Sequence, residues 1–143
     1  VETHVAFDFK QLLPAQQVLQ QLQLGYCFIQ QNQHEPAGIR SRYALEYLKQ
    51  KFVAAAQFHV VSLLNLQVNY RFQHRMGQYL DASGAAHHYG SYGLLDAKFL
   101  WQSPRWQAYV EGNNLLNRHY FDVGNVPQPG CWVVAGAAFN IQL

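Results

Sequence analysis

The chain contains residue types found in catalytic sites, but not at catalytic spacing. A serine or cysteine nucleophile needs an activating base beside it. The sequence has neither a Gly-x-Ser-x-Gly turn nor a cysteine within a known catalytic signature. The carboxylates form no local pair suited to acid and base catalysis, and the glycines form no phosphate-binding loop. Those carboxylates include Glu46, Asp81, Asp96, Glu111 and Asp122. We therefore expect no catalytic residue and no enzymatic activity.

Histidines and cysteines could bind a metal ion, but their spacing does not favour one. His87 and His88 are adjacent, so their side chains project differently, and no third ligand follows at a suitable distance. Cys27 and Cys131 are far apart and form no Cys-x-x-Cys pair. We expect no metal site, no cofactor and no disulfide scaffold.

Aromatic and cationic side chains in two polar stretches, residues 76–91 and 114–131, could recognise a ligand. Long connections often carry recognition because they tolerate variation. The candidate ligand-binding residues, which suit an anionic or aromatic chelate, are Tyr79, His87, His88, Tyr89, Arg118, His119 and Tyr120. The same residues also fit an aromatic belt at strand ends and a solvated loop, so these structural interpretations stay open.

Length and composition predict one ordered domain, or one piece of a domain. The 143 residues are 50% hydrophobic and 15% aromatic but only 13% charged, about half the usual quarter. The net charge of +2 comes from scattered single cations, so we expect no nucleic-acid partner. No stretch approaches the roughly 20 apolar residues of a membrane helix, and the N-terminus lacks the features of a secretion signal. We therefore expect neither a membrane-spanning helix nor a secretion signal in these 143 residues.

Alternating apolar and polar residues predict about seven antiparallel strands. The expected strands are residues 1–13, 18–28, 43–60, 64–75, 92–101, 106–113 and 132–143. Residues 43–60 also fit a helix because they contain three consecutive alanines, although we favour a strand. Short connections at 13–17, 61–63 and 102–105 alternate with long ones at 30–42, 76–91 and 114–131.

The polar sides of these strands contain mainly Gln and Asn, with few charged residues. This composition helps to distinguish a soluble barrel from a transmembrane barrel. A soluble barrel turns its apolar face inward and needs charge outside. A transmembrane barrel directs the apolar face to lipid and the polar face to a wet lumen, and its strands need about 9–11 residues. We favour the transmembrane arrangement, with Arg71, Lys98 and Glu111 in the lumen. Val68, Phe99 and Val110 would then face outward. A soluble lipocalin-like barrel that binds a small ligand is the alternative, and a purely structural barrel segment is a third possibility.

Four motifs in the last third of the chain have a characteristic order. They are Leu94-Leu95-Asp96-Ala97-Lys98 before a strand ending in Trp101, Trp106-Gln107-Ala108-Tyr109-Val110-Glu111, Asn113-Asn114-Leu115-Leu116-Asn117-Arg118-His119-Tyr120, and Pro127-Gln128-Pro129-Gly130. Together they resemble the C-terminal end of TonB-dependent outer-membrane receptors. Upstream, residues 70–77 resemble the aromatic-rich strand end of the same family.

The resemblance implies that residues 1–143 are the C-terminal portion of a receptor β-barrel domain, without the plug domain and the N-terminal strands. It implies the outer membrane of a Gram-negative bacterium, a barrel of about 22 strands, and uptake of a scarce nutrient such as a ferric siderophore, a cobalamin or a similar chelate. Its partners would be the rest of the barrel and its plug, TonB acting through the missing plug, outer-membrane lipid and the small-molecule nutrient. Because the barrel's first strand would be missing, residues 1–13 and 132–143 should each have one unpaired edge.

Overall fold

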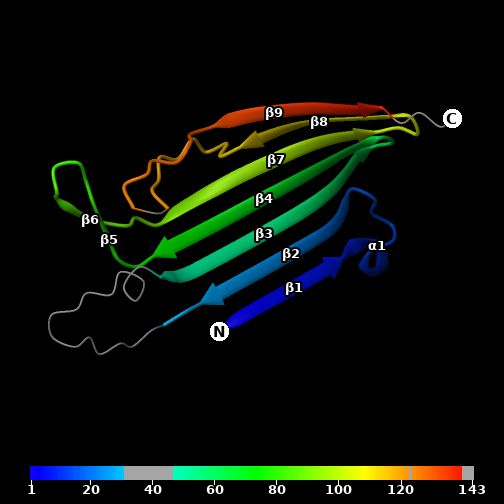
Figure 1. The fold of residues 1–143 in the computed structure, drawn as a ribbon. Coiled ribbons are helices and arrows are strands. Elements are labelled where there is room, and N and C mark those ends of the chain that lie inside the picture. The colour runs from blue at the N-terminus through cyan, green and yellow to red at the C-terminus, as the bar shows by residue number, and fades with distance from the viewer. Residues whose placement is uncertain (31–46, 123, 140–143) are drawn as a thin grey trace.

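Seven antiparallel strands form one continuous sheet in the computed structural model, which describes residues 1–30, 47–122 and 124–139. The strands lie side by side in chain order, without a crossover (Figure 1). They are β1 (Glu2–Asp8), β2 (Leu19–Phe28), β3 (Leu48–Val61), β4 (Leu64–Arg75), β7 (Tyr92–Gln102), β8 (Trp106–Asn113) and β9 (Trp132–Phe139). The predicted all-β class and antiparallel order are confirmed.

The first strand is shorter than predicted. β1 ends at Asp8, whose carboxylate accepts the backbone N–H of Lys10 at 3.0 Å and caps the short helix α1 (Phe9–Leu12). The expectation of a strand through residue 13 is therefore wrong at its end. This local side-chain hydrogen bond competes with the strand alternation that continues along the sequence.

The segment with mixed helical and strand features is a strand. β3 pairs with β2 on one side and with β4 on the other, over nearly its whole length. These two ladders outweigh the helical propensity of the alanine run. Residues 43–46 of this predicted strand, and residues 140–143 of the last one, lie outside the described part of the chain.

Long and short connections leave opposite ends of the sheet, which we call the loop end and the turn end (Figure 1). The expectation of an irregular loop over residues 76–91 is wrong in part. This connection contains a small hairpin of β5 (Gln78–Leu80) and β6 (Ala86–His88). The Asp81 carboxylate accepts the backbone N–H groups of Ser83 and Ala85 at 2.8 and 2.9 Å and holds the hairpin turn. Most of the predicted loop at 30–42 lies outside the described residues.

The register divides the sheet into an apolar face and a polar face, because directly paired residues point to the same side. One apolar rung crosses all seven strands through Phe7, Leu22, Ala56, Val68, Ala97, Gly112 and Val133. The next rung, on the polar face, consists of Asp8, Gln21, Gln57, Gln67, Lys98, Glu111 and Val134. As predicted, Arg71, Lys98 and Glu111 share the polar face, and Val68, Phe99 and Val110 share the apolar one.

The sheet is a single open layer. Within the described residues β1 and β9 form its two edges and do not pair with each other, as expected. The accessible surface is 10343 Å², compared with about 7,500 Å² for a compact monomer of this mass. No described helix is long and apolar enough to cross a membrane.

Candidate functional site

The connection between β8 and β9 folds back over the sheet, and we call residues 114–122 and 124–131 the strap. Its start is fixed by asparagines at positive φ, 50° at Asn114 and 47° at Asn117, a backbone region that Asn tolerates well. The Asn114 amide donates to the carbonyl oxygens of Arg118 and Pro129 at 2.9 and 3.0 Å. Asn117 Oδ1 accepts the N–H of Cys131. These two asparagines thus bind backbone groups, as Asn commonly does where a strand gives way to a loop.

Hydrogen bonds attach the strap to the sheet and to the hairpin connection. Asp96 accepts the backbone N–H of Asn114 at 2.8 Å. Asp122 Oδ1 lies 3.2 Å from Arg75 Nη2 and accepts the Tyr92 hydroxyl at 3.0 Å. The backbone N–H of Gly124 donates to the Tyr89 hydroxyl at 2.8 Å.

The best-buried side chains of the described residues lie at the loop end, within the strap or near it. These are Tyr89, Tyr92, Leu94, Gln73 and Asn114. Leu94 retains only 2% of its exposure, and it belongs to the polar face because it pairs with Arg71. In the described part of the chain, side chains are therefore buried chiefly at the loop end of the polar face.

Contacts between aromatic rings, some stacked and some tilted, join the hairpin, the strap and β7. The Tyr79 ring centre lies 4.8 Å from that of Phe121, 5.3 Å from Tyr89 and 5.6 Å from His87. The rings of Tyr92 and Tyr120 lie 4.3 Å apart. Beside these rings is an open pocket of about 100 Å³. It is lined by Tyr79, His88, Gly90, Ser91, Tyr92, His119, Tyr120 and Phe121.

Four of the seven predicted ligand-binding residues line this pocket: Tyr79, His88, His119 and Tyr120. The other three do not. His87 is held by Asp81 at 2.9 Å, and buried Tyr89 uses its hydroxyl to hold the strap. Arg118 hydrogen-bonds to Asn114 through its backbone. The pocket is thus aromatic and imidazole-lined, with no Lys or Arg among its described lining residues.

Sequence reasoning did not select Tyr92, Phe121, Arg71 and Arg75 for this site. Alternation could have placed Arg71 and Arg75 on one face near the loop end, since they are four residues apart, an even number, in a clear strand. No local sequence pattern predicts that the strap lies over the loop end. Tyr92 and Phe121 become neighbours of the candidate residues only through that fold.

Asp81 in the hairpin turn and Tyr120 in the strap have shifted pKa values. Hydrogen bonds from the Ser83 side chain, His87 and the Ala85 backbone lower the pKa of Asp81 well below its usual value. Burial raises the pKa of the Tyr120 hydroxyl, and the positive charge of Arg71 partly opposes this shift.

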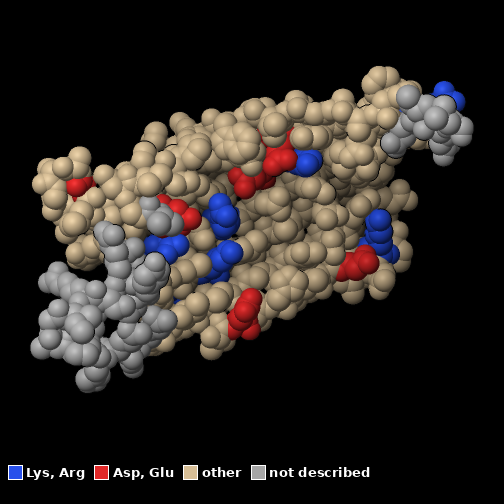
Figure 2. Space-filling model, in the orientation of Figure 1, with Lys and Arg blue, Asp and Glu red and all other residues tan. Residues whose placement is uncertain are grey.

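Charged side chains of the sheet gather on the polar face. Figure 2 shows small groups of both signs on otherwise uncharged surface. Lys98 Nζ lies 3.2 Å from Glu111 Oε2 and 4.2 Å from the centre of the Tyr109 ring. At the paired positions of the described strands, no Lys, Arg, Asp or Glu occupies the apolar face.

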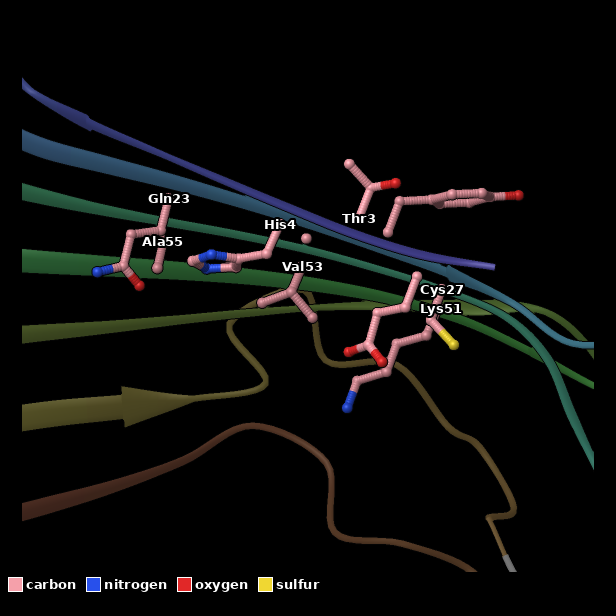
Figure 3. A pocket seen from close by; sticks show the side chains of 10 residues that line it. Thr3, His4, Gln23, Cys27, Lys51, Val53 and Ala55 are labelled. Carbon is pink, nitrogen blue, oxygen red and sulfur yellow. The ribbon is translucent and has the colours of Figure 1, made fainter.

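A second hollow lies across β1, β2 and β3. It has a volume of about 260 Å³ and is lined by Glu2, Thr3, His4, Gln23, Gly25, Tyr26, Cys27, Lys51, Val53 and Ala55. Figure 3 shows His4, Gln23 and Lys51 on one side of the strands and Thr3 on the other. Cys27 and Lys51 are direct cross-strand partners there. The hollow is therefore mainly a feature of the polar face, next to an open edge.

No cluster of three potential metal ligands occurs among the described residues. No protein-family model, curated protein or solved structure matches the chain. The arguments for function therefore come from the two faces of the sheet and from the loop-end site.

Proposed function

We propose that the chain is a segment of a transmembrane β-barrel in the outer membrane of a Gram-negative bacterium. We propose further that this barrel is a nutrient transporter of the TonB-dependent kind. The segment's apolar face would contact lipid, and its polar face would line the lumen. The observation that carries the proposal is the apolar face, which has no Lys, Arg, Asp or Glu at the paired positions of the described strands. Lys or Arg at the bilayer midplane costs about 2–4 kcal/mol.

The exposure of large apolar side chains supports this orientation. Phe99, Val110 and Trp106 retain 47%, 51% and 50% of their exposure on the apolar face. Soluble monomers rarely leave a continuous apolar surface of such extent uncovered. In the lipocalin-like alternative this face would surround an interior, whereas here the strap covers the opposite face.

Strand length and the placement of connections also fit a bilayer. β2, β3, β4 and β7 contain 10, 14, 12 and 11 residues, and about 9–11 suffice to cross the hydrocarbon. β1, β8 and β9 are shorter, with 7, 8 and 8 described residues. Short turns at one end and long connections at the other are the usual arrangement in such barrels.

The open edges support a larger assembly. With seven antiparallel strands in sequence order, β1 and β9 run in the same direction, so closing the sheet on itself would require a parallel pair. Bacterial barrels have an even number of antiparallel strands. Further strands of the same barrel would pair with both edges. A plug domain, through which TonB would act, would occupy the lumen.

The loop-end pocket would contact the transported nutrient, a scarce chelate such as a ferric siderophore or a cobalamin. Its rings and imidazoles offer stacking and hydrogen bonding. Replacing His88 and His119 together with Ala in the assembled receptor should weaken nutrient binding at the cell surface without lowering receptor abundance. Unchanged affinity at unchanged abundance would exclude these side chains from the binding site.

The orientation can be tested with the tryptophans, which lie on both faces. Trp106 is on the apolar face and Trp132, paired with Asn113, is on the polar face. Their exposures are nearly equal, 50% and 48%. In vesicles whose acyl chains are brominated near the headgroups, a variant keeping only Trp106 should be quenched strongly and one keeping only Trp132 weakly. Equal quenching, or stronger quenching of Trp132, would contradict the proposal.

A further inference from the structure

Arg71 lies within β4 on the polar face with its charge uncompensated. Its Nε atom is buried without a hydrogen-bond partner, and no described residue forms an ion pair with its guanidinium. Its direct neighbours across the sheet are the apolar residues Val53 and Leu94. A buried polar group without a partner is costly, so such a group in a native protein needs an explanation, and a bound ion is one of them.

The two carboxylates nearest along the sheet and the strap are already engaged. Asp96, two residues from Leu94, accepts the N–H of Asn114 at 2.8 Å. Asp122 is bound by Arg75 and by the Tyr92 hydroxyl. Among the described residues, neither carboxylate forms an ion pair with Arg71, and Asp122 forms its ion pair with Arg75.

The groups beside Arg71 add positive charge and a hydroxyl donor. Lys51 is its diagonal neighbour on β3, because Val53 pairs with Arg71 and Lys51 with Gln73. Tyr120 of the strap lies close enough for the charge of Arg71, and those of Asp122 and Asp96, to influence its hydroxyl. That hydroxyl has no hydrogen-bond partner among the described residues. Figure 2 shows Lys and Arg atoms gathered near the loop end of this face.

We infer that Arg71, with Lys51 beside it and the Tyr120 hydroxyl near it, forms an oxyanion-binding site for a carboxylate or phosphate group of a small molecule. A guanidinium binds either group through paired N–H donors, and a second cation and a hydroxyl strengthen such binding. This inference rests on the proposed function, since it treats the polar face as a wet lumen. It assigns the anionic part of the ligand to the sheet, below the aromatic pocket of the loops.

The test uses the whole chain, isotope-labelled and refolded in detergent micelles, with inorganic phosphate and citrate as probes. Titration followed by NMR should move the Arg71 Nε–H resonance saturably. Arg71→Gln should weaken binding by about tenfold or more, and Arg71→Lys by less, because Lys keeps the charge but not the paired donors. Tighter binding of citrate would identify a carboxylate site, and tighter binding of phosphate a phosphate site.

Arg105, exposed in the turn between β7 and β8 at the other end of the sheet, provides the matched control. Arg105→Gln should leave both affinities unchanged. A non-saturable shift of Arg71, or equal losses in Arg71→Gln and Arg105→Gln, would overturn the inference. If Arg71→Gln fails to fold, the titrations of the wild-type chain and of Arg71→Lys still test whether Arg71 binds the anion.

The tryptophan quenching experiment separates the two proposals. Quenching of Trp106 without anion binding would leave the barrel segment intact and remove the Arg71 site. Anion binding without quenching would retain the site but overturn its placement in a membrane lumen.

Discussion

Lys98 and Glu111 form an ion pair of 3.2 Å across β7 and β8, directly beside the pair Phe99 and Val110 on the opposite face. The charged side chains are 31% and 30% exposed, whereas Phe99 and Val110 are 47% and 51% exposed. A sheet that is more exposed on its apolar than on its charged side is inverted relative to a soluble protein. This inversion is the basis of the membrane proposal.

We expect only a modest coupling energy between Lys98 and Glu111. In a double-mutant cycle with Lys98→Met and Glu111→Gln, we expect a coupling of about 0.5–1 kcal/mol, because water reaches both groups. Urea unfolding in lipid vesicles would measure it. A coupling above about 3 kcal/mol would indicate a dry environment and contradict a wet lumen.

Gly136 should be intolerant of any side chain because Tyr109 lies over it. A Cβ atom there would come 2.6 Å from Cε1 of Tyr109. Gly136→Ala should destabilise the fold by about 1–3 kcal/mol, and much less in a Tyr109→Ala background. Gly90→Ala is the control, since nothing lies within 4 Å of its added carbon. Equal costs for the two alanines would refute the steric explanation.

The strap should loosen when Asp122 is replaced. Asp122→Ala removes the acceptor shared by Arg75 and the Tyr92 hydroxyl, at a cost of about 1–2 kcal/mol. Hydrogen exchange at the Gly124 amide, which donates to Tyr89, should accelerate by about tenfold. Asp8→Ala, at the turn end, should leave that exchange rate unchanged. Undisturbed exchange in Asp122→Ala would show that the strap is held by other contacts.

The hairpin turn should persist in acid. Because the folded pKa of Asp81 lies below its ordinary value of 3.8, its contribution to stability is present above the unfolded pKa and is lost as pH falls through the folded one. The Ser83 and Ala85 amide resonances should therefore keep their positions near pH 4 and change only at lower pH. Asp81→Asn should abolish that transition. A midpoint at or above 3.8 would contradict the hydrogen-bonded turn.

The sequence predicts the sheet well because alternation is a local property. The bounds of β4 and β8 follow directly from it, and so does the facing of Arg71 against Val68. The strap and the hairpin were not predictable in the same way. They depend on single hydrogen bonds of Asn114, Asp122 and Asp81, for which no periodic pattern exists. The loop-end pocket depends on both, so only some of its residues could be selected in advance.

Adjacent alanines provide the most direct test of the lipid-facing surface. Ala56 lies on the apolar face between Leu22 and Val68, and Ala55 on the polar face between Gln23 and Asn69. We would measure the free energy of unfolding in phospholipid vesicles for Ala56→Arg, Ala56→Leu and Ala55→Arg. We expect a loss of about 2–4 kcal/mol for Ala56→Arg, a loss of under about 1 kcal/mol for Ala55→Arg, and a gain of up to about 1 kcal/mol for Ala56→Leu. A loss for Ala56→Leu as well would indicate a packed protein interior, and equal losses for the two arginines would show no distinction between the faces; either result would contradict a lipid-facing apolar surface.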